Sequence, residues 1–300
     1  MITVKNLTKK FGDFTALNSI SCSIPEGSIY GMVGSNGAGK STFLRLLTGV
    51  YKEDGGEIKI DGMSVWENPD AKRLFMYVPD ELYFINGASI ERMAKLYDSM
   101  YGGFDYARLR DYAYKLGLNT RKSLNTFSKG MKRQAAIILA LATNPKYIFF
   151  DETFDGLDPV VRNVIKGFIY NDVVERKTTA IITSHSLREL EDTCDQLAML
   201  HKGGLVFERD ITDLKTSLFK VQIALSQEYS EEDFKEIDII HFTKKGSVAN
   251  MIVRGDREKT VAALKTYMPI ILDVLPLSLE EVFTYEMGAL GYDFSELEEG

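Results

Sequence analysis

The sequence predicts an α/β protein with a mostly parallel sheet in its first part and a small α+β domain after it. Three observations favour this fold class. Short runs rich in Ile and Val alternate with helical patterns, which is typical of strands joined by helical crossovers. A glycine-rich loop separates one such run from a helix. Beyond a boundary near Thr212 to Ser217, the pattern of short strands starts again.

Strands and helices are expected to alternate along residues 1–215. Expected strands lie within 4–24 and at 28–33, 58–60, 147–150 and 179–183, with turns at 54–56 and 61–62. Expected helices cover 40–48 and begin near 160 and 187, and helical patterns dominate residues 89–142. The middle block is therefore predicted to be a helical subdomain, at about 86–142, inserted into the sheet.

Residues 216–300 are expected to form a separate small domain. Its expected strands are 219–225, 237–242, 248–253 and 270–274, with helical segments at 230–233 and 257–267. Ser278 and Glu281 have the spacing of a capping box that opens a last helix. This βαββαβ order predicts a ferredoxin-like domain.

The bulk composition is that of a globular protein. The 300 residues are 45% hydrophobic and 26% charged, which suits one large domain and a small one. The net charge of −7 argues against a nucleic-acid or anionic-lipid binder, because such proteins carry a basic excess. We therefore expect no nucleic acid among the partners.

No segment predicts a membrane span or a secretion signal. The longest aliphatic run, Ala135 to Ala142, is far shorter than the roughly 18 residues that a span needs. Met1 to Lys10 hold no apolar core of signal-peptide length. Cys22 and Cys194 show no metal or redox spacing, which is typical of reduced thiols in the cytosol. A cytoplasmic chain is expected, and any membrane role should come through a partner.

One motif predicts a phosphate-binding loop. Residues 34–41 fit the pattern GxxxxGK[ST] and lie between an expected strand and an expected helix. Glycines let backbone N–H groups surround phosphate oxygens, while Lys40 reaches the β- and γ-phosphates and the Ser41 hydroxyl ligates Mg²⁺. The predicted nucleotide-binding residues here are Gly34, Ser35, Asn36, Gly37, Ala38, Gly39, Lys40, Ser41 and Thr42.

Two carboxylates end the apolar run Tyr147 to Phe150. Asp151 is placed to hold Mg²⁺, and Glu152 to orient or deprotonate an attacking water. Taken alone this signal is weak, because many buried strands end in an acid at a solvent edge. The phosphate-binding loop upstream favours the catalytic interpretation.

A third motif, Phe127-Ser128-Lys129-Gly130-Met131, opens the helix that ends near Ala142. Ser128 is a good N-cap, and capping alone would explain it. The alternative is that the helix start presents Ser128, the Gly130 N–H group and the helix dipole to a phosphate. Its place shortly before Asp151 and Glu152 favours that second interpretation.

These three motifs, in this order, resemble the ABC ATPase family over about residues 1–215. The resemblance implies a P-loop NTPase: a RecA-like parallel sheet core, an N-terminal antiparallel β-subdomain and an inserted helical subdomain. It also implies that ATP and Mg²⁺ are cofactors, and that each ATP lies between the phosphate loop of one chain and the Ser128 segment of another. Homodimers and heterodimers of ATPase subunits both remain open.

The resemblance assigns four more residues. Phe11 matches the aromatic residue that stacks on adenine, although a core phenylalanine beside Phe14 is the alternative. Asp158 matches the loop that crosses the dimer interface, and His185 matches the histidine that contacts the γ-phosphate. Asp80 stands where the family usually has Gln, so we expect it to contact Mg²⁺ or the attacking water. On that basis Asp80→Gln should keep much of the activity.

The resemblance implies an ATPase that acts with a separately encoded integral-membrane subunit. Ser278 to Phe283 is similar to the C-terminal segment of ABC-2-type exporter ATPases, which favours export of a drug, antibiotic or peptide. An ABC ATPase of a non-transport or regulatory complex is the alternative. A single phosphate loop argues against the two-domain translation type, and the presence of Glu152 and His185 argues against a non-hydrolysing module.

Overall fold

The structure is a computed structural model that describes residues 1–289. The chain divides into two compact units, Met1–Glu208 and Arg209–Gly300. The boundary predicted near residue 215 falls inside a helix of the second unit. The last residues of the predicted C-terminal domain, 290–300, lie outside the described residues.

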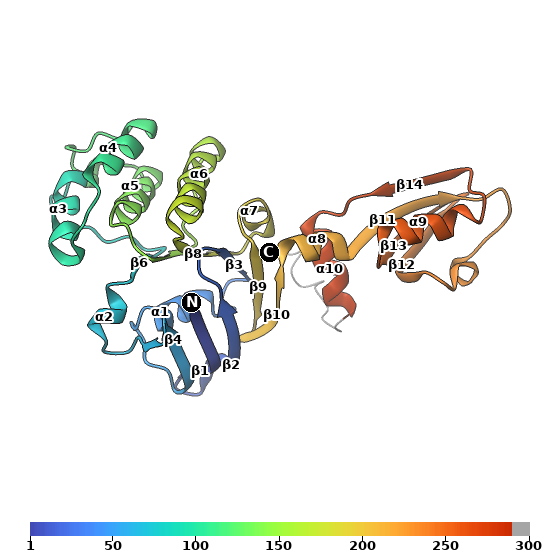
Figure 1. Ribbon diagram of the computed structural model, residues 1–300, viewed down its shortest axis with the longest axis horizontal. Coiled ribbons are helices and arrows are strands. Elements are labelled where there is room, and N and C mark those ends of the chain that lie inside the picture. Colours follow the sequence, from blue (N-terminus) through green and yellow to red (C-terminus); the bar gives the residue numbers. More distant parts are fainter. Residues whose placement is uncertain (290–300) are drawn as a thin grey trace. The chain divides into compact units, whose positions relative to one another are not determined.

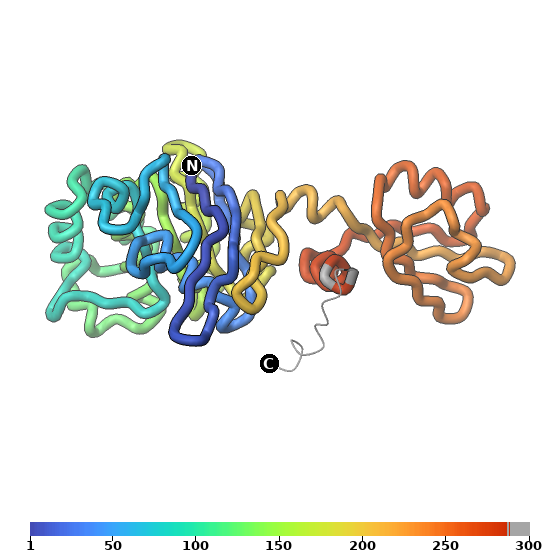
Figure 2. The backbone as a smooth tube through the Cα atoms, turned by 90° about the horizontal axis from the view of Figure 1, so that it is seen from below, coloured from blue at the N-terminus to red at the C-terminus, as the bar shows by residue number. Residues whose placement is uncertain are grey.

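The first unit begins with an antiparallel sheet of strand order β2-β1-β4-β5. Its strands are β1 (Ile2–Phe11), β2 (Phe14–Ile24), β4 (Gly55–Ile60) and β5 (Met63–Ser64). Figure 2 shows the long hairpin that β1 and β2 form near the N-terminus. Ile2, Val4 and Leu7 are buried while Lys5 is exposed, which confirms the predicted half-buried strands.

The start of β4 differs from the prediction. A turn is expected at 54–56, yet Gly55 already pairs with Thr8 of β1, and Gly56 falls where the register between the two strands shifts. Gly56 has a φ of +82°, and a Cβ there would lie 2.4 Å from the carbonyl oxygens of Lys5 and Asn6. The glycines therefore mark a close approach of two strands within an irregular part of the sheet.

The second sheet of this unit has the order β10-β9-β3-β8-β7-β6. Its strands are β3 (Ile29–Val33), β6 (Phe75–Val78), β7 (Tyr147–Asp151), β8 (Thr179–Ser184), β9 (Gln196–His201) and β10 (Gly204–Asp210). The strands from β9 to β6 pair in parallel, and β3, β7 and β8 are buried along their whole length. Their carboxyl ends meet at one edge, where ligands bind in open α/β sheets.

Seven α-helices complete the described first unit: α1 (Lys40–Leu47), α2 (Pro69–Lys72), α3 (Ile90–Tyr101), α4 (Tyr106–Lys115), α5 (Lys129–Ala142), α6 (Pro159–Arg176) and α7 (Leu187–Glu191). Helix α1 buries Phe43, Leu44 and Leu47 in the core that the two sheets share. Figure 1 shows α3, α4 and α5 grouped together with α6 beside them. The predicted helical insertion is thus found at α3 to α5, with a 3₁₀ turn at Leu124–Thr126 before α5.

The second unit holds the predicted βαββαβ order. Its elements are α8 (Ile211–Ser217), β11 (Leu218–Ala224), a 3₁₀ turn (Glu231–Phe234), β12 (Asp238–Lys245), β13 (Val248–Arg254), α9 (Arg257–Lys265), β14 (Ile271–Leu275) and α10 (Leu279–Ala289). The antiparallel sheet has the order β12-β13-β11-β14. The Ser278 N–H donates to Glu281 and the Glu281 N–H donates to Ser278 Oγ, which confirms the capping box.

Candidate active site

The phosphate-binding loop connects β3 to α1 at the carboxyl edge of the parallel sheet. The Ala38 N–H donates to the Ser35 carbonyl at 3.0 Å, so the loop curls back on itself. Gly39 has a φ of +110°, and a Cβ there would lie 2.9 Å from the Ala16 carbonyl oxygen. A Cβ on Gly34 would lie 2.4 Å from the Leu200 carbonyl oxygen. Glycine is therefore required at both positions by the packing of the loop against its neighbours.

Lys40 lies buried at the start of α1, beneath this loop. Its Nζ donates to the Gly34 carbonyl at 2.5 Å and to the Ser35 carbonyl at 3.2 Å. The same atom lies 3.2 Å from a carboxylate oxygen of Glu152, the residue that follows β7. The predicted phosphate-binding lysine and the predicted catalytic carboxylate are thus brought together.

Asp151, at the end of β7, accepts hydrogen bonds from three hydroxyl groups. Ser41 Oγ and Thr183 Oγ1 donate to Oδ1 at 3.0 and 2.9 Å, and the Tyr77 hydroxyl donates to Oδ2 at 3.0 Å. Burial, together with the charge of Asp151, raises the pKa of Tyr77, so this residue stays a donor. The carboxylate is therefore fixed by α1, β8 and β6.

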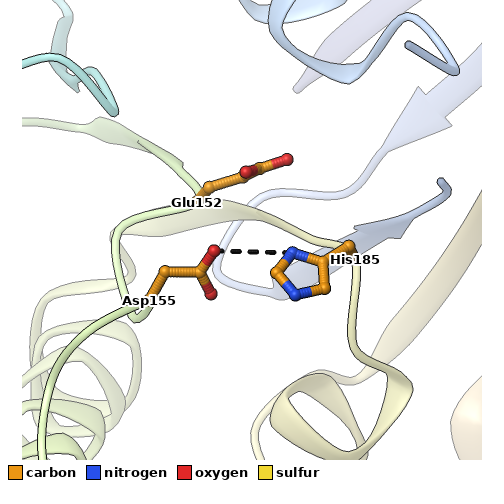
Figure 3. A group of neighbouring side chains, drawn as sticks. All are labelled: Glu152, Asp155 and His185. Carbon is orange, nitrogen blue, oxygen red and sulfur yellow. Dashed lines mark ion pairs between the residues drawn. The ribbon is translucent and has the colours of Figure 1, made fainter. Parts of the chain in front are cut away.

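Glu152, Asp155 and His185 form a cluster beside Asp151 (Figure 3). One ligand atom of each residue lies within 4.8 Å of the others, and His185 Nδ1 lies 3.4 Å from the Asp155 carboxylate. Burial raises the pKa of Asp155, and the charge of His185 opposes that shift. Glu152 has a φ of +47°, and its N–H donates to Thr183 Oγ1 at 3.1 Å. A strained backbone thus holds the predicted base at the sheet edge.

The Ser128 segment opens α5. Ser128 Oγ accepts from the Met131 N–H at 3.2 Å, which confirms the predicted cap, and the residue is exposed. A Cβ on Gly130 would lie 3.3 Å from the Gly156 carbonyl oxygen, so this glycine allows α5 to approach the loop after Glu152. Asp158, in the same loop, is exposed and caps α6 through Val160 and Val161.

Asp80 makes an ion pair that the sequence analysis did not predict. Its carboxylate pairs with Arg133 of α5, whose side chain is buried, while the Asp80 side chain is half exposed. The other NH group of Arg133 donates to the Asp155 carbonyl. The carboxylate of Asp80 is therefore held by an arginine, and its contact with Mg²⁺ stays a prediction.

Phe11 is exposed, as is Phe14 on the other strand of the hairpin. The ring of Phe11 meets Tyr51 edge to face, with the centroids 5.3 Å apart. Lys9 Nζ lies over the same ring, 5.5 Å from its centroid. Because the side chain is exposed, the alternative of a core phenylalanine is wrong, and stacking on adenine stays a prediction.

The sequence reasoning missed Tyr77, Thr183 and Arg133. Tyr77 and Thr183 lie near the ends of β6 and β8, which flank β7, and their hydroxyl groups face Asp151. A polar residue near the end of a neighbouring buried strand was the available signal. Arg133 had a weaker signal, as the last charged residue of a helix that is apolar after Gln134.

Helices that could span a membrane are not found within residues 1–289, since none combines the necessary length and apolar character.

Comparisons with known proteins show the family of the chain. A family model for the ABC transporter matches residues 17–155. The chain is 28% identical to the ABC transporter ATP-binding protein YtrB of Bacillus subtilis over 288 residues, covering 96% of this chain and 98% of YtrB. It is 30% identical to the lantibiotic transport ATP-binding protein SrtF of Streptococcus pyogenes over 216 residues, covering 70% of this chain and 91% of SrtF.

A solved structure of an ATP binding subunit of an ABC transporter has the same fold. Its TM-score is 0.66 at 24% identity, and the match covers 72% of this chain and 92% of that chain. The phosphate loop, the Asp151–Glu152 pair and His185 also lie together, as the family resemblance implies. The chain therefore belongs to the ABC transporter ATP-binding proteins and is an ATPase of that family.

Proposed function

We propose that this chain is the ATPase subunit of an exporter and drives a separate membrane subunit through closure and opening of an ATPase dimer. The observation that carries the proposal is the cluster of Lys40, Ser41, Asp151 and Glu152 around the phosphate loop. The similarity to a lantibiotic transport protein supports export of an antibiotic-like or peptide substrate.

Mg²⁺ fits the oxygen donors around Asp151. The Ser41 hydroxyl and the Asp151 carboxylate lie 3.0 Å apart, and hard cations such as Mg²⁺ prefer oxygen ligands of these kinds. When bound, Mg²⁺ would neutralise charge on the β- and γ-phosphates. Ser41 and Asp151 would hold it, and Asp80 is a further candidate ligand if its carboxylate leaves Arg133.

Glu152 is proposed as the general base and His185 as the contact for the γ-phosphate. Glu152 follows directly on the metal-binding carboxylate, so it is placed to accept a proton from a water that attacks the γ-phosphate. Lys40 would exchange its ion pair with Glu152 for phosphate oxygens, which frees the carboxylate for that water.

Residues 34–42 are proposed to cradle the phosphates, and Phe11 to stack on the base. Ser128, Gly130 and Asp158 are proposed to complete the site of a partner chain. Ser128 and Asp158 are both exposed in the single chain, which a residue that contacts a partner chain has to be. The partner is a second copy or a different ATPase subunit.

The segment after Asp80 is proposed to dock the membrane subunit, which places the chain at the cytoplasmic face of the membrane. Tyr83 is 84% exposed in this segment, so its ring is accessible to a partner.

Fractionation of host cells tests the transport function. The tagged chain should sediment with membranes, and Tyr83→Asp should move it to the soluble fraction. Tyr114→Asp, which makes the same change at a tyrosine of α4 that is 86% exposed, is the matched control and should leave the chain with the membranes. A wild-type chain found wholly in the soluble fraction would contradict the proposal and favour a non-transport ATPase.

A further inference from the structure

Arg133 is a buried charged residue to which the proposed mechanism gives no role. Its side chain is 2% exposed and lies one turn inside α5, after the exposed Ser128. Its guanidinium group donates to the Asp155 carbonyl and to the Asp80 carboxylate, and a weaker contact of 3.4 Å reaches the Asp80 carbonyl. Nε has no hydrogen-bond partner among the described residues.

The burial of this ion pair is strongly asymmetric. The Asp80 side chain is 49% exposed, whereas that of Arg133 is 2% exposed. Water can therefore solvate Asp80 without its partner, but it cannot solvate the guanidinium group of Arg133. A buried cation without a compensating charge is costly, so Arg133 depends on Asp80 more than Asp80 depends on Arg133.

The contacts of Arg133 join three segments that meet at the ATP site. Asp80 lies in the segment between β6 and α3, Arg133 belongs to α5, and Asp155 lies in the loop after Glu152. The Asp155 carboxylate in turn lies 3.4 Å from His185 Nδ1. A continuous chain of polar contacts thus runs from Asp80 through Arg133 and Asp155 to His185.

We propose that Arg133 is a positioning residue for ATP hydrolysis and that Asp80 is its counter-ion. Arg133 holds the loop of Asp155, and through it the orientation of His185. Asp80 neutralises the buried charge, and its contact with Arg133 fixes the segment before α3 against α5. The inference rests on the roles proposed above for Glu152 and His185.

From the sequence, Asp80→Gln is expected to keep much of the activity, but an ion pair with Arg133 predicts the opposite. Glutamine keeps a hydrogen-bond acceptor near Arg133 but removes the negative charge, so the buried cation is left uncompensated. Asp80→Gln should therefore lower both stability and turnover. Arg133→Gln removes the buried charge itself and leaves a half-exposed carboxylate, so it should lower turnover with little loss of stability.

A double-mutant cycle on the full-length chain tests the pair. Asp80→Gln should lower the melting temperature by roughly 5–15 °C, and Arg133→Gln by less than about 3 °C. Each single variant should lower kcat at least about tenfold with little change in KM for ATP. In the double variant the buried charge and its counter-ion are both absent, so its melting temperature should match that of Arg133→Gln. Its kcat should also match that of Arg133→Gln and fall no further, because the contact with the Asp155 carbonyl is already lost in that single variant.

Asp172→Asn is the matched control for a general loss of stability. Asp172 is buried and pairs with Arg108 of α4 at 2.8 Å, and it contacts neither Asp80, Arg133 nor Asp155 in the described structure. This variant should lower the melting temperature while kcat of the folded enzyme stays within about twofold of wild type.

Two results would overturn the proposal. Additive losses of melting temperature and kcat in the double variant would show that the two residues act independently. A raised Mg²⁺ requirement in Asp80→Gln, not shared by Arg133→Gln and not relieved in the double variant, would make Asp80 a metal ligand instead. Lys40→Ala distinguishes failure of the proposed function from failure of this inference. If the wild-type chain hydrolyses ATP no faster than Lys40→Ala, the catalytic roles proposed for Glu152 and His185 are wrong. The melting temperatures of the Asp80 and Arg133 variants still test the ion pair in that case.

Discussion

Lys40 Nζ lies 3.2 Å from the Glu152 carboxylate, so the phosphate-binding lysine and the proposed general base form an ion pair. The pair is largely buried, and both residues lie at the carboxyl edge of the parallel sheet. In the proposed mechanism, Glu152 accepts a proton from water only after Lys40 has turned to the phosphates. The proposal therefore links ATP binding and activation of the base through one side chain.

Glu152→Gln should abolish turnover while ATP binding is kept. Glutamine has the same size but cannot act as a base, so the hydrolysis rate should fall roughly 10²–10⁴-fold. Removal of the ion pair also leaves Lys40 available to the phosphates, so ATP affinity should be unchanged or higher. Steady-state phosphate release and equilibrium titration with ATP measure the two effects. Turnover near that of wild type would exclude Glu152 as the base.

Phe11→Ala should weaken binding of every nucleotide to a similar extent. Stacking is indifferent to the identity of the base, and loss of an aromatic stack costs about 1–3 kcal/mol. ATP and GTP should be hydrolysed by the wild-type chain at rates within about tenfold of each other. Phe14→Ala is the control, since Phe14 is exposed on the neighbouring strand. Strict ATP selectivity would point to a group that reads the edge of the base.

Tyr77→Phe should lower kcat/KM by about tenfold, because it removes one charge-assisted hydrogen bond to Asp151. The aromatic ring stays in place, so the melting temperature should change little. Tyr114→Phe removes a hydroxyl from a tyrosine that is 86% exposed on α4, and it should leave kcat/KM unchanged. An unaltered kcat/KM in Tyr77→Phe would show that Ser41 and Thr183 suffice to hold the carboxylate.

Asp61 gives the first unit part of its stability at neutral pH. Burial favours a higher pKa for Asp61, but hydrogen bonds from Lys146 and the Met1 amino group outweigh it and hold the pKa well below its usual range. A lowered pKa stabilises the fold above the unfolded-state pKa of about 4, and this stability is lost as the pH falls below that value.

Asp61→Asn should therefore melt at a lower temperature than wild type at pH about 7, and the difference should narrow as the pH falls below about 4. Asp13→Asn, at the exposed turn between β1 and β2, is the control. A difference in melting temperature that stays constant across this range would show that the charge of Asp61 is not its cause.

Local sequence patterns predicted the parts of the fold that depend on neighbouring residues. The phosphate loop, the end of β7 and the capping box of Ser278 are each specified by a few consecutive positions, and the structure has them where the sequence predicts. Strands β9 and β10 were not predicted. In β9 the apolar run Leu197–Leu200 is short and begins only a few residues after α7, so its periodicity cannot distinguish a strand from a helix.

The contacts of Asp80 could not be predicted in the same way. Asp80 and Arg133 are separated by 53 residues and meet only because α5 packs against β6. Family resemblance suggested a metal contact, since the position usually carries an uncharged amide. A charged side chain at that position instead finds a partner on α5, which is a tertiary effect that no local pattern reports.

The most direct test of the account is the oligomeric state of Glu152→Gln with and without ATP. The chain has one phosphate loop and one exposed Ser128 segment, and the proposed site needs both from different chains. Each bound ATP should join two chains through several charge-assisted hydrogen bonds. Light scattering of the purified variant should show a monomer without nucleotide and a dimer at saturating ATP. A monomer under both conditions would contradict pairing of two copies of this chain, and a dimer under both would contradict closure driven by ATP.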